Sequence, residues 1–470
     1  MSSDRFDAAV LGGGIAGLTA AASLAAAGRR VLLAERNRAA GGCCASFRRG
    51  PFRFDAGTSA LSGLGPGGRL RRIFSDLGVT PPLLRPPVRE TVVTDRFAFA
   101  LPAEADGVRE AFATRFPGQR AALDSFFDLL AGGAAGRPPA TLAAGLAACG
   151  IDGDCAFLLE ALLGNLGVPA ASVDGATALA FYREFLLDGG WYPSGGMGAL
   201  ATALAERVRA GGSAVSCGRE VVALIAAGED ISAARFADGG ECRAAAFVSA
   251  LSARRTHAMA PPTPPAVERL REMDRLALAP SAFMVFLGLD RRLDELTPHA
   301  GHILSIPEGE MAAVFRTLDD DRLLLAPEGY VYVIAPSRID PAAAPPGGES
   351  VCLFVLAPWR SPAFWEARRR EMADALVARA ERVLPGLSAC VRVAESSTPQ
   401  TIERWTGNDG GAIYGWEAVP GQSGASRLSP LTPWRNLFLA GHWTRPGSGV
   451  SAAAYSGHLA ARTVRRHLAE

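Results

Sequence analysis

Lysine is absent from this sequence of 470 residues, so arginine supplies all 48 basic side chains. The 47 acidic residues balance them and leave a formal net charge of +1. This balance gives no electrostatic basis for binding nucleic acid. Cysteine is also scarce. The eight cysteines include no Cys-x-x-Cys pair, so we expect reduced thiols in a cytoplasmic protein rather than a disulfide framework.

Long apolar runs and metal-binding patterns are missing as well. The uncharged stretch 8–28 approaches the roughly 20 residues that span a bilayer, but glycines interrupt it, so a strand, a turn and a helix explain it better. His299 and His302 have a spacing that zinc sites use, yet no third ligand lies nearby, so we expect a polar loop and no metal. The vicinal Cys43 and Cys44 fit either a redox-active pair or small residues packed beside a turn.

Hydrophobic residues make up 49% of the chain, and the mean hydropathy is +0.15. The length is enough for two or three lobes. Near the start, Phe6–Leu11 and Arg30–Glu35 are short apolar segments typical of buried strands, and Ile15–Ala27 between them has the composition of a tightly packed helix. Together they predict a βαβ unit with a right-handed crossover.

A glycine motif, Gly12-x-Gly14-x-x-Gly17, lies where the first strand leads into the helix. Gly12 allows the tight turn, Gly14 lets a pyrophosphate approach the backbone, and Gly17 lets the helix pack on the sheet. The helix N-terminus adds unpaired N–H groups and a partial positive charge. Glu35 ends the second strand, where its carboxylate can accept hydrogen bonds from a ribose diol. These residues predict a dinucleotide site that disfavours a 2′-phosphate.

Two further features favour FAD over NAD. The pair Gly41-Gly42, followed by the segment 54–57 (FDAG), permits a second close approach of the backbone to a long cofactor. Near the other end of the chain, a strand at 436–440, a glycine turn and a helix within 448–467 form a similar unit. The N-terminus of that helix, near Val450, could stabilise the charge of reduced flavin. A cofactor held by both ends of the chain suits an extended FAD.

Between the two ends, the spacing of apolar residues predicts helices at 121–130, 156–166, 198–210 and 364–384. Short strands at 214–216, 221–226, 231–236 and 244–249 predict a β-meander, and further strands are expected at 281–289, 330–336 and 350–357. The prolines at 261–265 indicate a linker or an exposed turn.

Four stretches of the sequence resemble a known family. They are LGGGIAGLTAAASLAAAGRRVLLAERNRAAGG at 11–42, YPSGGMGALATALAERV at 192–208, ERWTGNDGGAIYGW at 403–416 and LFLAGHWTRPGSGVSAAAYSGHLAA at 437–461. With these, the chain resembles the phytoene desaturase, carotenoid isomerase and retinol saturase-like group of FAD-dependent oxidoreductases. That group lies within the superfamily of amine oxidases and prenylated-Rab escort proteins.

The resemblance implies FAD contacts in three separate segments. The implied residues are Gly12, Gly14, Ile15, Ala16, Gly17, Glu35, Arg36, Gly42, Cys43, Val221, Gly441, His442, Gly449 and Val450. Two of them depart from the family pattern. Cys43 stands where the family often has Arg or Ser, and His442 stands where it usually has the Asp that binds the ribityl chain.

The resemblance also implies an α/β fold, in which a Rossmann-like FAD-binding domain of the glutathione reductase/amine oxidase type carries an inserted α+β substrate-binding domain. The expected FAD-binding segments are 1–90, 196–260 with the β-meander, and 416–470. The expected substrate-domain segments are 91–195, mainly helical, and 261–415, with sheet and helix.

The implied activity is FAD-dependent desaturation, saturation or cis–trans isomerisation of a long apolar polyene or isoprenoid. The sequence identifies no catalytic residue, although Glu403 fits either a proton relay or, as the preferred interpretation, a structural salt bridge. Trp191 and Tyr192 fit either a cavity wall or a packed domain junction. Candidate residues for an apolar substrate tunnel, each of which also fits ordinary core, are Phe157, Leu158, Leu162, Leu163, Phe181, Tyr182, Phe185 and Leu186.

Two alternatives to this activity stay open. The first is an amine oxidase-like flavoenzyme, for which Trp443 and Tyr455 offer aromatic rings near the flavin. The second is a non-enzymatic escort protein that binds prenyl groups. A lipophilic substrate, together with the positive mean hydropathy, also suggests peripheral contact with the inner face of a membrane.

Overall fold

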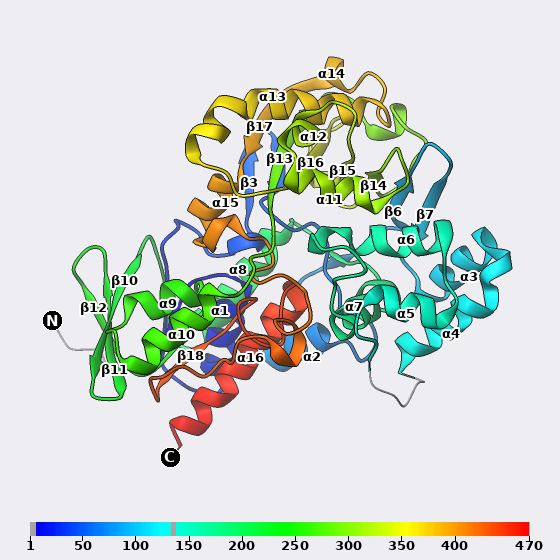
Figure 1. Cartoon of the computed structure of the whole chain (residues 1–470). Coiled ribbons are helices and arrows are strands. Elements are labelled where there is room, and N and C mark those ends of the chain that lie inside the picture. The colour runs from blue at the N-terminus through cyan, green and yellow to red at the C-terminus, as the bar shows by residue number, and fades with distance from the viewer. Residues whose placement is uncertain (1–5, 133–137, 470) are drawn as a thin grey trace.

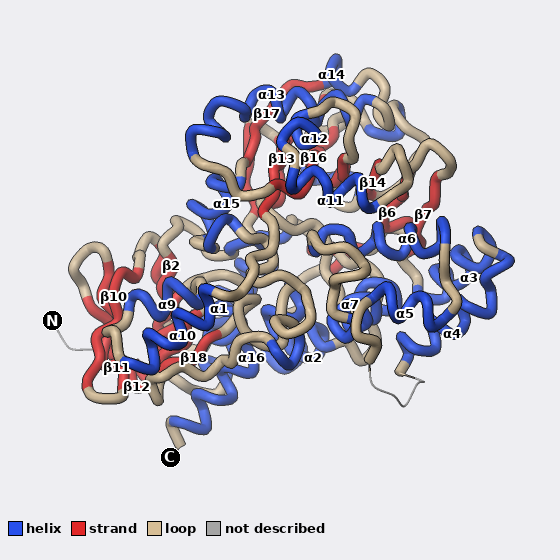
Figure 2. Tube along the Cα trace, in the orientation of Figure 1, coloured by secondary structure: helices blue, strands red, loops and turns tan. Residues whose placement is uncertain are grey.

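The computed structural model describes residues 6–132 and 138–469, and its strands gather in two separate seven-stranded sheets. Figure 2 shows these sheets as two red regions, one at the left and one above the centre. Figure 1 shows that both termini lie on the side of the first sheet, while the middle of the chain forms the second sheet and a group of helices beside it.

The first sheet has a parallel core built from both ends of the chain. Its order is β10-β11-β12-β1-β2-β9, and β18 pairs with β12. The strands are β1 (Phe6–Leu11), β2 (Val31–Glu35), β9 (Ala214–Cys217), β10 (Val221–Ala227), β11 (Asp230–Phe236), β12 (Glu241–Ser249) and β18 (Leu437–Leu439). The central strands are mainly apolar, with Asp7 in β1 and Glu35 at the end of β2 as exceptions, because both faces of a parallel sheet are buried.

The structure confirms the predicted βαβ unit and the late strand, and it corrects the β-meander. The segment 214–216 was expected to be its first strand, but β9 pairs in parallel with β2 at the edge of the main sheet. The antiparallel meander comprises β10, β11 and the first part of β12 only. The rest of β12 runs beside β1, because it continues past the meander into the parallel core.

Four helices cover one face of the first sheet. They are α1 (Ile15–Ala26), α2 (Arg69–Leu77), α8 (Met197–Ala210) and α16 (Val450–His467). α1 and α16 approach so closely that a Cβ on Gly457 of α16 would overlap the carbonyl oxygen of Ala16 in α1. On the other side of this lobe lie α9 (Ala253–Met259) and α10 (Pro264–Asp274).

The second sheet has the order β17-β13-β16-β15-β14-β6-β7. Its strands are β6 (Val88–Val93), β7 (Ala98–Pro102), β13 (Ser281–Leu289), β14 (His302–Ser305), β15 (Val331–Ile334), β16 (Glu349–Ala357) and β17 (Val391–Ser397). One face packs on α13 (Pro362–Glu381), and the other packs on the hairpin of β3 (Ser46–Arg49) and β4 (Phe52–Asp55). Shorter helices in this part are α11 (Met311–Asp319), α12 (Asp321–Leu325), α14 (Leu387–Cys390) and α15 (Pro399–Thr406).

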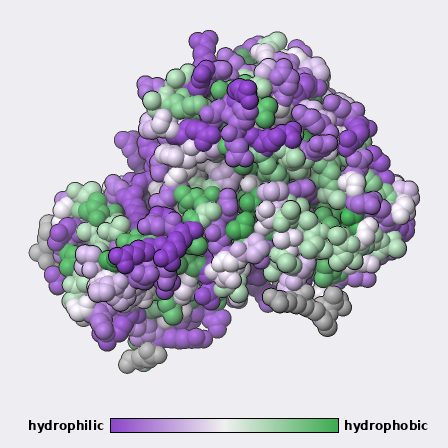
Figure 3. Space-filling model, viewed as in Figure 1, coloured by the Kyte–Doolittle hydropathy of each residue, from purple (hydrophilic) through white to green (hydrophobic). Residues whose placement is uncertain are grey.

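A group of five helices shares its core with the second sheet. They are α3 (Ala105–Arg115), α4 (Arg120–Ala131), α5 (Leu142–Cys149), α6 (Gly153–Leu163) and α7 (Gly175–Tyr182). α5 and α7 consist largely of alanine and leucine, so apolar residues also gather on the molecular surface near them (Figure 3). This group lies at the right of Figure 1.

A buried polar junction connects the β3–β4 hairpin to the start of α8. Asp55 accepts hydrogen bonds from the Tyr192 hydroxyl at 2.6 Å, from the Ser46 hydroxyl at 2.6 Å and from the Met197 backbone N–H at 3.0 Å. Tyr192 itself belongs to the short strand β8 (Tyr192–Pro193), which pairs with β5 (Leu83–Leu84). Asp55 therefore pairs with the Met197 N–H at the start of α8, whose N-cap residue provides no side-chain hydrogen bond. It also joins the β3–β4 hairpin, β8 and α8.

Two sequence expectations in this region need correction. The linker or exposed turn expected at 261–265 covers residues 261–263 only, since Pro264 opens α10, where the fixed φ of proline favours a helix start. His302 does not lie in a polar loop. It opens the buried strand β14, and its Nδ1 accepts a hydrogen bond from the Ala335 backbone N–H at 3.1 Å.

Candidate functional site

The turn between β1 and α1 has the shape that its glycines predict. Gly12 has a φ of 98°, and its N–H donates to the Ala34 carbonyl of β2 at 2.8 Å. A Cβ on Gly17 would overlap the carbonyl oxygen of Gly12, so the helix packs directly on the turn. A Cβ on Gly14 would meet no atom within 4 Å. Gly14 therefore faces open space, while its neighbours are tightly packed.

The first turn of α1 has the geometry of an anion-binding site and contains no acidic side chain of its own. Its N-cap is Gly14, with no side-chain hydrogen bond, and no acidic residue lies in the first turn. Unpaired N–H groups and the helix dipole favour a phosphate there. Ile15 and Ala16 form this turn and are both buried. An open position at Gly14 beside an uncapped helix start fits the pyrophosphate of a dinucleotide.

Glu35 lies beside this turn at the end of β2 and is buried. One carboxylate oxygen accepts from the Gly13 N–H at 2.7 Å, and the other accepts from the Asn37 N–H at 2.7 Å. A carboxylate has about four acceptor positions, so two remain for a ribose diol. The two backbone donors hold Glu35 in the orientation that this role needs.

The glycine pair at 41–42 packs against the same turn. The Gly41 N–H donates to the Gly13 carbonyl at 2.8 Å, and a Cβ on Gly42 would lie 3.1 Å from the Gly14 Cα. Cys43 follows, half-buried, and its Cβ lies close to Gly57. Burial raises the pKa of both vicinal thiols, and none of the eight cysteines is in a disulfide. Two thiols with raised pKa are poor nucleophiles, so the packing interpretation is favoured.

The C-terminal segment returns to the start of α1. The Gly441 N–H donates to the Ser456 hydroxyl at 3.1 Å, and a Cβ on Gly441 would lie 3.6 Å from the Ala16 Cβ. Gly449, with a φ of 93°, is the N-cap of α16, which begins at Val450 and has no side-chain cap. The two ends of the chain thus place two uncapped helix N-termini in one lobe.

Val221 and Arg36 lie around the end of β2. Val221 opens β10 and is buried, just after Arg219, whose N–H donates to the Glu35 carbonyl at 2.8 Å. Arg36 extends the other way, and its guanidinium donates to the backbone carbonyls of Glu403 and Arg404 in α15. Val221 is therefore near Glu35, whereas Arg36 connects the two lobes.

His442 stands beside a buried arginine that the sequence had not indicated. Arg427 donates from Nε to the His442 carbonyl at 2.7 Å and from Nη2 to the Tyr414 carbonyl at 2.7 Å. Burial lowers the pKa of Arg427 to about 10, so it stays charged at neutral pH. No ion pair to Arg427 occurs in the described part of the chain. No sequence pattern pointed to Arg427, because it lies in an irregular loop outside the four stretches that resemble the family.

Burial, and to a lesser degree the Arg427 charge, lowers the pKa of His442 to about 3. The imidazole is therefore neutral at neutral pH and cannot supply the negative charge of an aspartate. Its ring packs against Trp443 at 5.2 Å between centroids. His442 thus places a neutral group where the resemblance implies a charged aspartate.

A cavity of about 50 Å³ lies between α6, α7 and the second sheet. Four of the eight predicted tunnel residues line it, namely Leu162, Leu163, Phe181 and Phe185. The others belong to the surrounding core, and the Tyr182 hydroxyl donates to the Leu159 carbonyl at 2.6 Å. The polar groups Glu90, Tyr332 and Tyr414 in its wall were not predicted. The sequence feature that could have indicated these polar groups was the charged pair Arg89-Glu90, which interrupts the valines of β6.

Other candidate residues have structural partners. Glu403 accepts a hydrogen bond from the Gly410 N–H at 3.1 Å and takes part in none of the ion pairs among the described residues, so the preferred interpretation of a structural salt bridge was wrong. Trp191 lies under the Arg85 guanidinium, which supports the junction interpretation for this aromatic pair. Within residues 6–132 and 138–469, no cluster of His, Cys, Asp or Glu could hold a metal. No helix in these ranges is both long and apolar enough to cross a bilayer.

Comparison with known proteins agrees with this geometry. The model of the family described as flavin containing amine oxidoreductase matches residues 15–465. The chain is 27% identical over 285 residues to a chloroplastic prolycopene isomerase of Arabidopsis thaliana, a match that covers 58% of this chain and 45% of the isomerase. It is 28% identical over 276 residues to a zeta-carotene-forming phytoene desaturase of Myxococcus xanthus, covering 57% and 51%. The matches span about half the length of these relatives.

A solved structure shows the same fold over the whole chain. The crystal structure of an oxidoreductase from Methanosarcina mazei superposes with a TM-score of 0.71 at 18% identity, covering 97% of this chain and 99% of that one. This likeness concerns the fold alone.

The open space at Gly14 gives a direct test of the cofactor site. Gly14 has a φ of −69°, which alanine adopts freely, and no protein atom obstructs the added methyl group. We expect Gly14→Ala to fold normally but to bind FAD at least about tenfold more weakly, because the methyl group fills the phosphate position. Titration of the flavin-free protein with FAD, followed by flavin fluorescence, measures this.

Gly118→Ala is the matched control, because a Cβ at Gly118 also meets no atom within 4 Å and the residue lies in the helical group. Its FAD affinity should equal that of the unaltered protein. Unchanged affinity in Gly14→Ala would place the pyrophosphate elsewhere.

The depressed pKa of His442 predicts a loss of stability in acid. Between about pH 6.5 and pH 3, the unfolded chain takes up a proton at His442 that the folded chain does not. The free energy of unfolding should therefore fall by about 1.4 kcal/mol per pH unit from this group as the pH is lowered. Urea denaturation at pH 6, 5 and 4 should show a steeper loss for the unaltered protein than for His442→Gln. Parallel pH profiles would contradict the assignment.

Proposed function

The chain belongs to the flavin containing amine oxidoreductase family, and on that premise we propose that it acts on carbon–carbon bonds of a long apolar polyene or isoprenoid. The reaction class is desaturation, saturation or cis–trans isomerisation. Family membership confirms the predicted flavin cofactor, FAD, and the oxidoreductase class, and the solved structure agrees with the predicted α/β fold. The curated relatives are named as a prolycopene isomerase and a phytoene desaturase, which supports the proposed substrate class.

We place FAD along the residues that surround the first turn of α1. Gly12, Gly14 and Gly17 shape the pyrophosphate position, and Glu35 is oriented for the ribose. Gly42 and Gly441 approach the same turn from two other segments. The bound flavin would accept or return a hydride, while the protein positions the substrate. The three proposed FAD-binding segments are 1–90, 196–260 and 416–470, and the substrate domain comprises 91–195 and 261–415.

One observation carries the proposal most directly, namely that the apolar cavity and the C-terminal flavin segment share a wall. Tyr414 lines the cavity with its side chain, and its carbonyl accepts from the same Arg427 guanidinium that holds the His442 carbonyl. Burial raises the pKa of Tyr414 to about 12, and the nearby Cys43 thiol adds to this shift. Tyr414 therefore lies between the cavity and the glycine pair at 41–42. An apolar ligand in the cavity would approach the cofactor from this side.

The amine oxidase alternative is less well supported by the aromatic residues. The Trp443 ring packs edge-on against Trp416 at 4.8 Å, and the Tyr455 ring lies under the Arg69 guanidinium at 4.5 Å. The two rings therefore have separate partners, an aromatic ring for Trp443 and a guanidinium group for Tyr455. The escort alternative requires no flavin, whereas this chain keeps an open phosphate position at Gly14.

Pigment analysis tests the proposed activity. We expect expression in a bacterial host that accumulates carotenoid precursors to change either the absorption maxima or the isomer ratio of the extracted pigments, as resolved by chromatography. Longer absorption wavelengths indicate desaturation, shorter ones saturation, and altered isomer ratios isomerisation. Gly14→Ala, which should lose FAD, is expected to leave the pigments unchanged.

Unchanged pigments with a flavin-loaded protein would contradict the proposal, and hydrogen peroxide released from primary amines by that protein would favour the amine oxidase alternative. A purified protein that gains no flavin when refolded with FAD would favour the escort alternative.

We also propose that the protein contacts a membrane surface through two exposed tryptophans. Trp405 on α15 is 56% exposed and Trp359 is 41% exposed. They belong to adjoining segments, because the Gln400 side chain donates to the Arg360 carbonyl at 3.1 Å. Indole side chains favour the interface between lipid and water. Such a contact would bring a lipophilic substrate near the protein.

Liposome flotation tests this contact. The FAD-loaded protein should co-float with neutral phosphatidylcholine vesicles, and the double variant Trp359→Ser/Trp405→Ser should lose most of that binding. A matched change at two exposed arginines, Arg322→Ser and Arg271→Ser, should not. Protein that stays at the bottom of the gradient would exclude this membrane contact.

A further inference from the structure

The cavity wall contains an acid in an unexpected place. Glu90 lies in the middle of β6, is 4% exposed and faces the cavity. Its direct partner is the Tyr332 hydroxyl of β15, which donates to Glu90 Oε2. The ion pairs within residues 6–132 and 138–469 include none to Glu90, although Arg89 is its neighbour in sequence. The carboxyl group is therefore paired with a phenol instead of a cation.

Arg89 makes its hydrogen bond elsewhere, to Phe185, and its Nε and Nη2 atoms are buried without a hydrogen-bond partner in the part of the chain that the structure describes. Its guanidinium donates to the Phe185 carbonyl and lies 3.9 Å from the centroid of the Phe185 ring. Burial raises the pKa of Glu90, and the Tyr332 hydrogen bond and the Arg89 charge offset this only in part. A raised pKa makes the carboxyl group easier to protonate, and the protonated form can both donate and accept a hydrogen bond.

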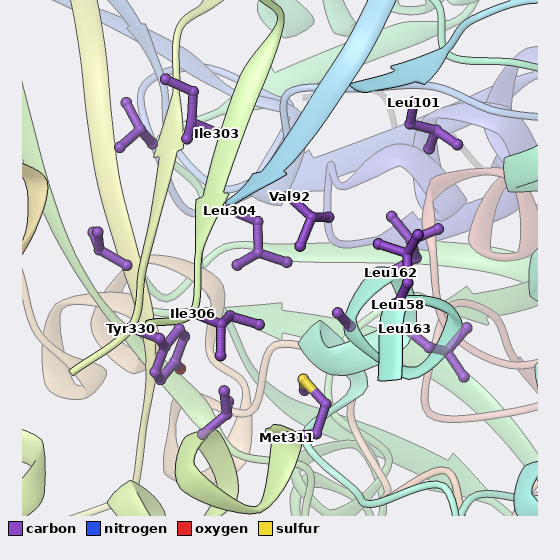
Figure 4. Packing of buried hydrophobic residues seen from close by; sticks show 14 of the residues in the cluster. Val92, Leu101, Leu158, Leu162, Leu163, Ile303, Leu304, Ile306, Met311 and Tyr330 are labelled. Atoms are coloured by element: carbon purple, nitrogen blue, oxygen red, sulfur yellow. The ribbon is translucent and has the colours of Figure 1, made fainter. Parts of the chain in front are cut away.

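The rest of the wall is mostly apolar, with Asn165 and Tyr414 as its other residues that carry polar groups. Leu162 and Leu163 of α6 and Leu304 of β14 line the cavity, and Figure 4 shows the two α6 leucines across from Leu304 and Val92. A volume of about 50 Å³ is well below the roughly 150 Å³ of a cavity that holds benzene. The cavity thus has room for the end of a ligand and not for its whole chain.

A hydrocarbon end group would be a poor match for this wall. It would cover the Glu90 oxygen that does not accept from Tyr332 without giving that oxygen a hydrogen bond, and burying a polar atom without a partner is unfavourable. An end group with a hydroxyl or carbonyl oxygen would pair with Glu90 while its carbons contact the leucines. Selection by a hydrogen bond in an apolar pocket is stronger than selection by shape alone.

We propose that this cavity is an end-group pocket, in which Glu90 and Tyr332 select isoprenoid ligands that end in a neutral hydroxyl or carbonyl group. This inference rests on the proposed function, since it refines the substrate class of the same protein. Glu90 makes the hydrogen bond to the ligand oxygen, and Tyr332 is a positioning residue that holds the carboxyl group toward the cavity. Tyr414 is the wall residue that connects this pocket to the cofactor side.

Binding of a matched pair of ligands tests the proposal. Farnesol and farnesene are isoprenoids of equal chain length, one an alcohol and the other a hydrocarbon. We expect the FAD-loaded protein to bind farnesol about tenfold more tightly, as measured by quenching of tryptophan fluorescence. Glu90→Leu should remove this preference, and Tyr332→Phe should reduce it. Glu90→Gln, which keeps a donor and an acceptor, should retain most of it.

Tyr330→Phe is the matched control for Tyr332→Phe. Tyr330 is also buried, and its hydroxyl accepts from the Leu356 N–H at 2.6 Å, away from the cavity lining. Its farnesol preference should equal that of the unaltered protein. FAD content and melting temperature of each variant establish folding. If Glu90→Leu does not fold, Tyr332→Phe and the unaltered protein still decide the outcome.

The outcomes separate this proposal from the proposed function. Equal affinities for farnesol and farnesene in the unaltered protein would overturn the end-group pocket and leave the polyene enzyme intact. A farnesol preference that survives both Glu90→Leu and Tyr332→Phe would overturn the assignment to these residues. Failure of the FAD-loaded protein to bind either ligand would count against the proposed isoprenoid substrate itself.

Discussion

Helix α1 packs backbone to backbone against the turn before it and against α16, and this constraint determines where both ends of the chain lie. On one side, Gly17 packs directly on the Gly12 carbonyl of the preceding turn, and on the other, Gly457 of α16 packs on the Ala16 carbonyl. Neither contact leaves room for a side chain. Because α1 is fixed in this way, the turn before it and the segment before α16 must meet at one place. Two helix N-termini without caps then lie in the same lobe, which suits a long cofactor that carries negative charge on its diphosphate and, when reduced, on its flavin ring.

The features that the sequence predicted well are those in which local pattern and burial agree. The glycine motif, Glu35 at the end of β2 and the strand before Gly441 all lie in short apolar segments with an unambiguous turn. Pairing between distant strands was harder. The segment 214–216 has the same composition in a meander as at the edge of a parallel sheet, so only its partner β2 decides its place. The hydrogen bond between Glu90 and Tyr332 joins strands far apart in sequence, and no local pattern reports it.

The segment 54–57 has a structural role that differs from the cofactor role expected from its sequence. It was expected to help the backbone approach the cofactor, but Asp55 points to the start of α8 and accepts three hydrogen bonds there. Arg53 in the same strand pairs with Asp340 at 2.6 Å, and Asp340 accepts from the Gly195 N–H at 2.8 Å. Gly196 and Gly198 are needed because the buried polar side chains of this junction leave no space for a Cβ at these two positions. That stretch therefore serves the junction between the lobes.

Arg427 binds its neighbours through their backbone carbonyls, and this has a consequence for how the protein can diverge. The carbonyls of Tyr414 and His442 keep their positions whatever side chains these residues carry. Replacement of either side chain would leave the anchor between the two lobes in place. The side chains at 414 and 442 could therefore be exchanged without loss of the two hydrogen bonds that these carbonyls accept from Arg427.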